Sequence, residues 1–307
     1  RDPEMSRGLG DVYKRQWKWS VSGNIGVNRN EISDLGLLPA DFGCLGERVG
    51  YYGNSLGDHF GVGHIFLAGE APGLFYGYVT QGIVQKEDIT ENGIKYIKQD
   101  GSVGYYQTVN KTTPVAGDVK YVDRNGDGVV DDNDRDIIGN PNPDFTYGFQ
   151  TKVSWKSLSL SASFNGVQGR DILNVGNRYN NTPGTKSNNV TRKAFQNMWT
   201  DENPSNLYPK STFVVQNMVM DRYVEDGSYL RCSDITLSYV LPAKWTNKIG
   251  IKNTSVYASV KNAFVITDYS GYDPEVNSFA FDGLRPGVDM NSYPTPRSFV
   301  FGLNLTF

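Results

Sequence analysis

The sequence is poor in the residues that most often build metal centres and covalent cross-links. Its 307 residues include two cysteines, Cys44 and Cys232, and two histidines, His59 and His64. Neither cysteine belongs to a CxxC pair or to a zinc-ligand spacing, and the two lie far apart in the sequence. The sequence therefore gives no support to a zinc site, a disulfide or a histidine base.

Long hydrophobic runs and clusters of basic residues are also missing. No stretch approaches the roughly 18 apolar residues that a transmembrane helix needs, so a membrane location would have to rest on strands. The formal net charge is −3, and lysines and arginines are not clustered, which argues against a nucleic-acid partner. No pair of carboxylates has recognisable glycosidase context, and no glycine run matches a phosphate loop, so we expect no enzyme activity.

The beginning of the chain does not read as part of a fold. The chain starts with Arg1, not with Met, and residues 1–16 show neither an apolar period nor a strand pattern. We interpret residues 1–16 as a non-native scar and residues 17–307 as a fragment of a longer protein. The basic and apolar regions of a signal peptide are missing, so we expect any such segment upstream.

Alternation of apolar and polar residues is the clearest signal in the chain. Between Ser157 and Asn165, every second residue is apolar and the residues between them are serines. Such a period of two places apolar side chains on one face of a strand and polar ones on the other. The same pattern recurs in segments whose apolar positions include Trp17, Trp19, Val21, Ile25, Val27; Tyr147, Phe149, Val153, Trp155; Ile235, Leu237, Tyr239, Leu241; Val256, Ala258, Val260; and Phe299, Phe301, Leu303, Leu305, Phe307.

The lengths of these segments and of their connections favour a transmembrane barrel. The runs approach the 9–11 residues of a tilted membrane-spanning strand, whereas soluble strands more often have about 5–6. Connections alternate between long and short, as they do where external loops are long and periplasmic turns are tight. The long ones carry turn residues, and Thr191–Thr200 is the only short helix expected. Gly61–Leu67 is a weaker strand candidate, and it leaves residues 29–60 too long for a periplasmic turn.

Five separated segments together resemble the SusC/RagA family of TonB-dependent outer-membrane transporters. They occur in the family's order and cover nearly everything after Trp17. The segments are GLFYGYVTQGI (73–83), GDVKYVDRNGDGVVDDNDRDIIGNPNPDFTYGF (117–149), DGSYLRCSDITLSYVLP (226–242), KNAFVITDYSGYDPEV (261–276) and SYPTPRSFVFGLNLTF (292–307).

This resemblance implies an all-β fold, namely the C-terminal part of a large antiparallel transmembrane β-barrel with long extracellular loops. Barrels of this family have about 22 strands around a plug domain, which is absent from this sequence. The implied function is energy-dependent import of nutrients, most often glycans, across the outer membrane of the cell. The implied partners are a SusD-like surface lipoprotein, TonB acting through the missing N-terminal region, and the outer-membrane assembly machinery.

One acidic segment has the spacing of a calcium-binding loop. Calcium takes six to eight oxygen ligands, and a twelve-residue loop supplies them from positions one, three, five, seven, nine and twelve. Gly128 stands at position six, where the chain must turn sharply. No incoming helix is expected, so a solvated acidic turn is the alternative interpretation. The predicted ligands are Asp123, Asn125, Asp127, the carbonyl of Val129, Asp131 and Asp134.

Two groups of aromatic residues have both functional and structural interpretations. The apolar stripe Phe299, Phe301, Leu303, Leu305 and Phe307 resembles the C-terminal barrel-assembly signal that the insertion machinery reads. Aromatics near strand ends fit an interfacial girdle or ordinary cross-strand packing; they are Trp17, Trp19, Tyr147, Trp155 and Tyr239. Tyrosines in the connections could stack on sugar rings, although packing is favoured for each; they are Tyr105, Tyr106, Tyr179, Tyr269 and Tyr272.

Two other classes of protein stay open at this point. The main alternative is a secreted, calcium-stabilised β-sandwich that binds carbohydrate. A glycan-degrading enzyme is the third interpretation. Dependence on detergent would separate the transporter from the other two classes. A plug domain upstream would confirm the transporter, and a hydrolase domain there would refute it.

Overall fold

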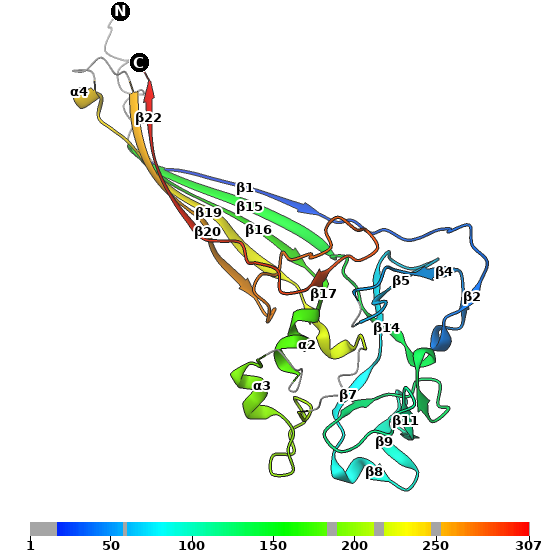
Figure 1. The fold of residues 1–307 in the computed structure, drawn as a ribbon. Coiled ribbons are helices and arrows are strands. Elements are labelled where there is room, and N and C mark those ends of the chain that lie inside the picture. Colours follow the sequence, from blue (N-terminus) through cyan, green and yellow to red (C-terminus); the bar gives the residue numbers. More distant parts are fainter. Residues whose placement is uncertain (1–16, 58–59, 183–188, 212–217, 247–252, 307) are drawn as a thin grey trace, which may run out of the picture.

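The structure is a computed structural model that describes residues 17–57, 60–182, 189–211, 218–246 and 253–306. Its largest element is an antiparallel sheet of six long strands, which extends away from a globular half formed by the connections (Figure 1). The strands have nine to fifteen residues and follow one another in chain order across the sheet. They are β1 (Lys18–Gly26), β15 (Phe145–Trp155), β16 (Leu158–Gln168), β19 (Tyr229–Val240), β20 (Asn253–Thr267) and β22 (Ser298–Thr306).

The register of the strands lines up residues of one kind across the whole sheet. Leu160 lies opposite Val153 on one side and Leu237 on the other. Directly opposed residues point to the same face, so the alternation within each strand becomes continuous rows. One apolar row is Trp19, Val153, Leu160, Leu237, Ala258 and Phe301. The adjacent row, on the other face, is Ser20, Lys152, Ser161, Thr236, Ser259 and Val300.

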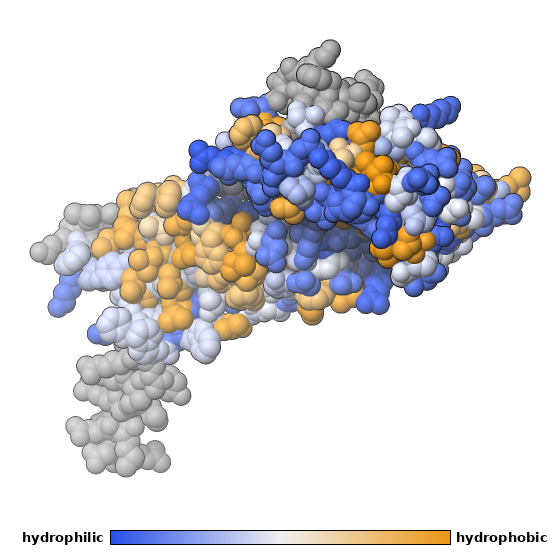
Figure 2. Space-filling model, turned by 90° about the horizontal axis from the view of Figure 1, so that it is seen from below, coloured by the Kyte–Doolittle hydropathy of each residue, from blue (hydrophilic) through white to orange (hydrophobic). Residues whose placement is uncertain are grey.

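The apolar face of this sheet is open to its surroundings. Trp19 is 73% exposed, Leu160 47% and Phe301 78%. Figure 2 shows hydrophobic side chains gathered over the end of the molecule that holds the strands, with hydrophilic ones over the globular half. A sandwich would have buried such a face, so the arrangement favours the barrel interpretation of the sequence.

A bulge at Ser233 changes which residues of β19 point to each face. Ser163 of β16 lies opposite Asp234, but the next residue, Phe164, lies opposite Cys232. The extra residue reverses the alternation, because a shift of one position moves every side chain to the other face. Arg231 therefore lies on the polar face, where an unbroken alternation from Leu237 and Ile235 would have placed it on the apolar one.

The proposed strand at Gly61–Leu67 does not belong to this sheet. Within this segment the strand is β5 (His64–Leu67), which lies in a separate four-stranded sheet with the order β14-β6-β5-β4. All four residues of β5 are buried, so they show no alternation with which to distinguish a barrel strand from a core strand. Residues 27–144 are consequently one long connection, and the long and short connections alternate without the exception that the sequence suggested.

The remaining elements are short. The small sheets contain β2 (Ala40–Asp41), β3 (Glu47–Arg48), β4 (Gly50–Tyr52), β6 (Leu74–Gly77), β7 (Thr80–Ile83), β8 (Ile89–Thr90), β9 (Gly93–Ile97), β10 (Val103–Tyr106), β11 (Thr108–Val109), β12 (Val119–Tyr121), β13 (Val129–Val130), β14 (Asp136–Gly139), β17 (Asp171–Asn174), β18 (Val224–Asp226) and β21 (Val288–Asp289). The 3₁₀ turns are η3 (Gly43–Leu45), η4 (Lys86–Asp88), η5 (Asp132–Asp134) and η6 (Asp221–Tyr223).

Three α-helices are described, of which the sequence predicted one. α3 (Arg192–Asn197) confirms the helix expected within Thr191–Thr200, and the hydroxyl of Thr191 caps it by accepting a hydrogen bond from the amide of Ala194. The other two are α2 (Val175–Asn181) and α4 (Ala243–Thr246), which are too short to show an apolar period. No helix among the described residues is long and apolar enough to cross a membrane.

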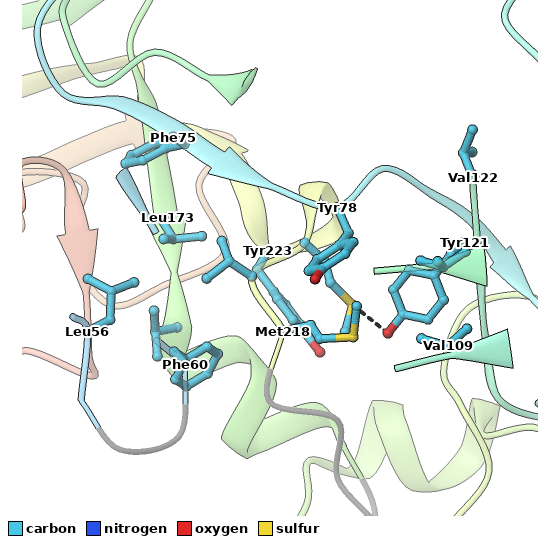
Figure 3. Close-up of a cluster of buried hydrophobic side chains, with 14 of the residues drawn as sticks. Leu56, Phe60, Phe75, Tyr78, Val109, Tyr121, Val122, Leu173, Met218 and Tyr223 are labelled. Carbon is cyan, nitrogen blue, oxygen red and sulfur yellow. Dashed lines mark hydrogen bonds between the residues drawn. The ribbon is translucent and has the colours of Figure 1, made fainter. Parts of the chain in front are cut away.

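The long connections share a hydrophobic core, which the sequence analysis did not predict. Phe75 and Tyr121 come from the connection 27–144, Leu173 and Tyr223 from 169–228, and Val288 from 268–297. Figure 3 shows side chains from the first two connections packed together. Within this core, the hydroxyl of Tyr121 donates to the sulfur of Met220 at 3.6 Å. The sequence analysis found turn residues and no core periodicity in these segments, because their strands of two to five residues are too short to show a period.

Substitutions on the two faces of β16 should differ sharply in cost. In the full-length protein, Leu160→Arg places a charge on the face predicted to meet lipid and should cost about 2–4 kcal/mol near the midplane. Ser161→Arg places the same charge on the polar face and should cost much less. Folding of each variant into lipid vesicles, followed by urea titration, measures the difference; equal costs would contradict the barrel assignment.

Candidate functional site: the polar face and the acidic loop

The polar face of the sheet carries a charged group whose hydrogen bonds are supplied by its neighbours. Asp234 accepts hydrogen bonds from Lys261 at 2.6 Å and from the hydroxyls of Thr236 and Ser259, both at 2.7 Å. These residues come from β19 and β20, and all four point to the same face. A face that supports a compact polar network is suited to contact with water.

A second, more buried network joins the polar face to the connection 268–297. Arg231 is 5% exposed and pairs with Asp273 at 2.5 Å and with Glu275 at 3.2 Å. Glu275 accepts hydrogen bonds from the hydroxyl of Tyr229 at 2.7 Å and from the side-chain amide of Asn165 at 2.9 Å. The bulge at Ser233 makes this network possible, since it turns Arg231 and Tyr229 toward the polar face.

The other half of the same connection is bound to the globular half of the molecule. His64 hydrogen-bonds through Nε2 to the carbonyl of Pro286 at 2.8 Å, and Arg285 donates to the carbonyl of Ser55 at 3.0 Å. Asn54 donates to the carboxylate of Asp282 at 2.9 Å. Residues 268–297 therefore tie the sheet to the globular half.

The acidic loop is a tight turn whose carboxylates cap its own backbone. Asp123 accepts from the amides of Gly126 at 2.5 Å and Gly128 at 2.8 Å, and both glycines have positive φ. Asp134 accepts from the amides of Arg124 at 2.7 Å, Asn125 at 3.2 Å and Asp131 at 2.8 Å. The predicted positions are thus parts of one turn, with Asp123 and Asp134 at its buried base.

The remaining predicted ligands lie around the exposed part of this turn. Asp127 accepts from the amide of Val129 at 2.8 Å and from the side chain of Asn125 at 3.0 Å, and Asp131 accepts from Asn133 at 2.9 Å. Among the described residues, no group of three or more His, Cys, Asp or Glu side chains is arranged to hold a metal ion. The donor chemistry fits calcium, but the carboxylates here are directed at backbone amides.

Burial leaves this turn with an unfavourable charge. Desolvation raises the pKa of Asp134 above its usual value, and the nearby carboxylate of Asp123 raises it further, against the lowering effect of the backbone amides. Arg124, within the turn, is paired with Asp136. A divalent cation bound at this turn would relieve the repulsion between the carboxylates.

The aromatic candidates separate into packed and exposed groups. Trp17 and Trp155 stack at a centroid distance of 5.5 Å, which is cross-strand packing at the strand end where a girdle would lie. Tyr106 and Tyr269 are buried, and Tyr179 packs edge-on against Phe60, so none of these three is free to stack on a sugar. The tyrosines that stay available are Tyr105, which is 39% exposed, and Tyr272, which is 68% exposed.

The predicted assembly stripe lies on the edge strand of the sheet. Phe299, Phe301, Leu303 and Leu305 are all exposed, and β22 pairs with β20 alone in the described chain. Register places Phe299, Phe301 and Leu303 on the apolar face through their partners Val260, Ala258 and Val256, and Leu305 continues the stripe opposite Thr254. Phe307 lies outside the described residues.

Comparison with known proteins shows that this chain is similar to TonB-dependent receptors. No protein-family model matches it. The chain is 30% identical over 309 residues to TonB-dependent receptor P3 of Formosa agariphila, and 29% identical over 313 residues to TonB-dependent receptor SusC of Bacteroides thetaiotaomicron. These alignments cover 99% of this chain in each case, and 28% and 26% of the relatives.

A solved structure is also similar to this chain. The RagAB peptide importer in its open-open state matches 95% of this chain and 27% of its own, with a TM-score of 0.63 and 25% sequence identity. The chain is a relative of the SusC/RagA-type TonB-dependent receptors. Its six-stranded sheet is accordingly a portion of a barrel wall, with the apolar face toward lipid and the polar face toward the lumen. The chain spans less than a third of the length of these relatives.

Sequence reasoning found the alternating faces and the acidic turn of this SusC/RagA relative, but it missed the lumenal network. Arg231 sits in a strand among apolar neighbours, and its partners Asp273 and Glu275 lie more than forty residues further along the chain. A charge breaking the apolar alternation of Leu237 and Ile235 was the only available signal. In this chain that charge, Arg231, accompanies both a bulge and a lumenal contact.

The burial of His64 should make the globular half sensitive to acid. Burial lowers the pKa of His64 from 6.5 to about 4, so the folded protein favours the neutral imidazole. Its stabilising effect is complete above pH 6.5 and is lost as the pH falls toward 4, with a limit on the order of 3 kcal/mol.

Thermal unfolding of the full-length receptor at several pH values measures this effect. The difference in Tm between the wild type and His64→Gln should shrink between pH 7 and pH 4.5, because glutamine does not titrate. A difference that stays constant over this range would show that His64 does not gain a proton on unfolding.

Proposed function

We propose that this chain forms part of the wall and of the extracellular surface of an outer-membrane importer for nutrients. The observation that carries this proposal is the six-stranded wall with an exposed apolar face and a polar face opposite. Such a wall separates lipid from a hydrated passage. The similarity to TonB-dependent receptors supports the same function and points to transport in place of catalysis.

The nutrient that we propose is an oligosaccharide or another glycan. The similarity of this chain to SusC and to receptors of Formosa agariphila supports energy-dependent uptake driven by TonB. A SusD-like lipoprotein at the cell surface is the proposed second subunit, by analogy with the two-component RagAB importer. That importer is described as a peptide transporter, so a peptide is the second candidate substrate.

The apolar stripe of β22 has a proposed role in assembly. Phe299, Phe301, Leu303 and Leu305 lie on an edge strand, whose backbone donors and acceptors need a partner before they enter lipid. We propose that the outer-membrane assembly machinery recognises this stripe, together with Phe307, while the barrel closes.

Uptake by cells tests the proposed transport directly. Deletion of the gene in its native host should abolish uptake of at least one labelled oligosaccharide from a panel that also contains peptides, and the intact gene should restore it. A gene that carries Leu160→Arg serves as the control for a receptor that fails to assemble. Loss of peptide uptake alone would favour the second substrate, and uptake of every compound without the gene would contradict an import function.

We further propose that calcium orders the turn around Asp123 and Asp134. The twelve-residue spacing, the two glycines with positive φ and the clustered negative charge support this role. Bound calcium would draw oxygens from Asp123, Asn125, Asp127, Val129, Asp131 and Asp134 and would act as a structural ion. External loops meet calcium-rich surroundings, so a site with a Kd of roughly 10⁻⁴–10⁻³ M would be occupied.

Replacing one ligand of this turn should remove the effect of calcium. Limited proteolysis of the full-length receptor near Asn125 should be slower with calcium than with a chelator, and Asp127→Ala should abolish the difference. Asp100→Ala, which removes an exposed carboxylate outside the turn, is the matched control and should keep the difference. If cleavage of the wild type is indifferent to calcium, the segment is an acidic turn and nothing more.

A further inference from the structure

A pocket of about 210 Å³ lies between α2, α3 and the segment that follows them. None of the residues proposed for calcium or for assembly contributes to it. It is lined by Asn177, Asn181, Thr182, Lys193, Leu207, Tyr208, Pro209, Arg222 and Tyr223. The lining thus combines side-chain amides, two tyrosines and two cationic groups, and it contains no acidic residue.

The two cations of the pocket have no carboxylate partner in the described part of the chain. Lys193 is exposed and takes part in none of the ion pairs recorded there. Arg222 donates a hydrogen bond to the carbonyl of Leu207 at 2.6 Å and forms no ion pair with a described residue. Its neighbour Asp221 forms no ion pair with it; that carboxylate accepts from the amide of Thr80 at 3.1 Å and from the hydroxyl of Thr80 at 2.6 Å.

Glu225, which accepts a hydrogen bond from Asn177 in the wall of the pocket, already has four hydrogen-bond donors. Glu225 accepts hydrogen bonds from the side chains of Asn174 at 3.0 Å and Asn177 at 2.9 Å. It also accepts from the amide and the hydroxyl of Ser270, both at 2.9 Å. A carboxylate that is held by four hydrogen bonds has little freedom to turn toward Lys193 or Arg222, so neither cation gains it as an ion-pair partner.

The walls of the pocket are fixed by hydrogen bonds between its elements. Asn181 donates to the side-chain oxygen of Asn177 and accepts from the hydroxyl of Thr191 at 2.7 Å, which joins α2 to the start of α3. On the opposite side, the amide of Trp199 donates to the carbonyl of Tyr208 at 3.0 Å. A charged site whose walls are already ordered loses little conformational entropy on binding.

We propose that this pocket is a subsite for one acidic group of the imported ligand, a carboxylate or sulfate ester carried by a sugar residue. Arginine and lysine supply charge-assisted hydrogen bonds to such an anion, while the amides and tyrosine rings meet sugar hydroxyls and ring faces. A volume of about 210 Å³ suits one acidic group with part of its ring. This inference rests on the proposed import of glycans and narrows the substrate to charged ones.

Binding of defined saccharides to the full-length receptor tests the subsite. By calorimetry, trigalacturonate should bind the wild type, and Lys193→Gln should weaken it about tenfold, the loss expected for one charge-assisted contact. Arg222→Gln should have a similar effect. A sulfated trisaccharide tells sulfate from carboxylate, and a neutral galactose trimer should bind equally to all variants.

Arg192→Gln is the matched control, because Arg192 lies next to Lys193 on α3 but does not line the pocket. It removes the same charge and should leave the affinity for trigalacturonate unchanged. Equal effects of Lys193→Gln and Arg192→Gln, or equal binding of acidic and neutral saccharides by the wild type, would overturn the subsite. Failure of the glycan function itself would appear differently, as absence of binding and uptake for every saccharide, the neutral trimer included.

Discussion

The structure depends on one constraint, namely that a backbone crossing lipid must find all its hydrogen-bond partners in neighbouring strands. Water is absent from the hydrocarbon layer, and each unpaired amide or carbonyl there costs several kcal/mol. The six strands meet this requirement by pairing in chain order over nine to fifteen residues each. Side chains are then free to serve the two surroundings, apolar toward lipid and polar toward the lumen. The edges of β1 and β22 stay unpaired in the described chain, so the sheet is a portion of a closed wall.

The lumenal side shows how the extracellular half is attached to this wall. The bulge at Ser233 brings a buried guanidinium, that of Arg231, to the lumenal face, where it binds Asp273 and Glu275. A buried charge that lost these partners would be costly, so the connection 268–297 is held firmly at this point. Its other half is held by His64 and Asn54 in the globular part. The connection 268–297 therefore joins the extracellular half to the strands.

Much of the wall could be predicted from the sequence, and most of the globular half could not. The alternation around Leu160 survives because each face meets one kind of surroundings along the whole strand. The four residues of β5 are buried on both faces, so their pattern resembles a strand of any fold, and their assignment to the barrel was wrong. The core around Tyr121 and Tyr223 joins residues about a hundred positions apart through strands too short to carry a period.

Of the two candidate sites, the acidic turn could be predicted from the sequence and the cationic pocket could not. The acidic turn was visible because its six ligand positions lie within twelve consecutive residues. The cationic pocket was not, because Lys193 and Arg222 come together only after α2 and α3 have packed. The sequence indicates the bulge at Ser233 only through Arg231, a charged residue at a position where the alternation predicts an apolar one. This signal can be interpreted only when the pairing with the neighbouring strands is known.

Spin labels along β19 test the central claim, that one face of these strands meets lipid and the other the lumen. Single cysteines at positions 229–231 and 235–237, in a full-length receptor whose Cys44 and Cys232 are replaced by serine, would carry the labels in lipid vesicles. Accessibility to oxygen should be high at 235, 237 and 230 and low at 236, 229 and 231, because 236 faces the lumen and 229 and 231 are buried against the connection 268–297. The alternation should thus reverse across Ser233. A uniform accessibility, or an alternation that continues unbroken through Ser233, would contradict the account.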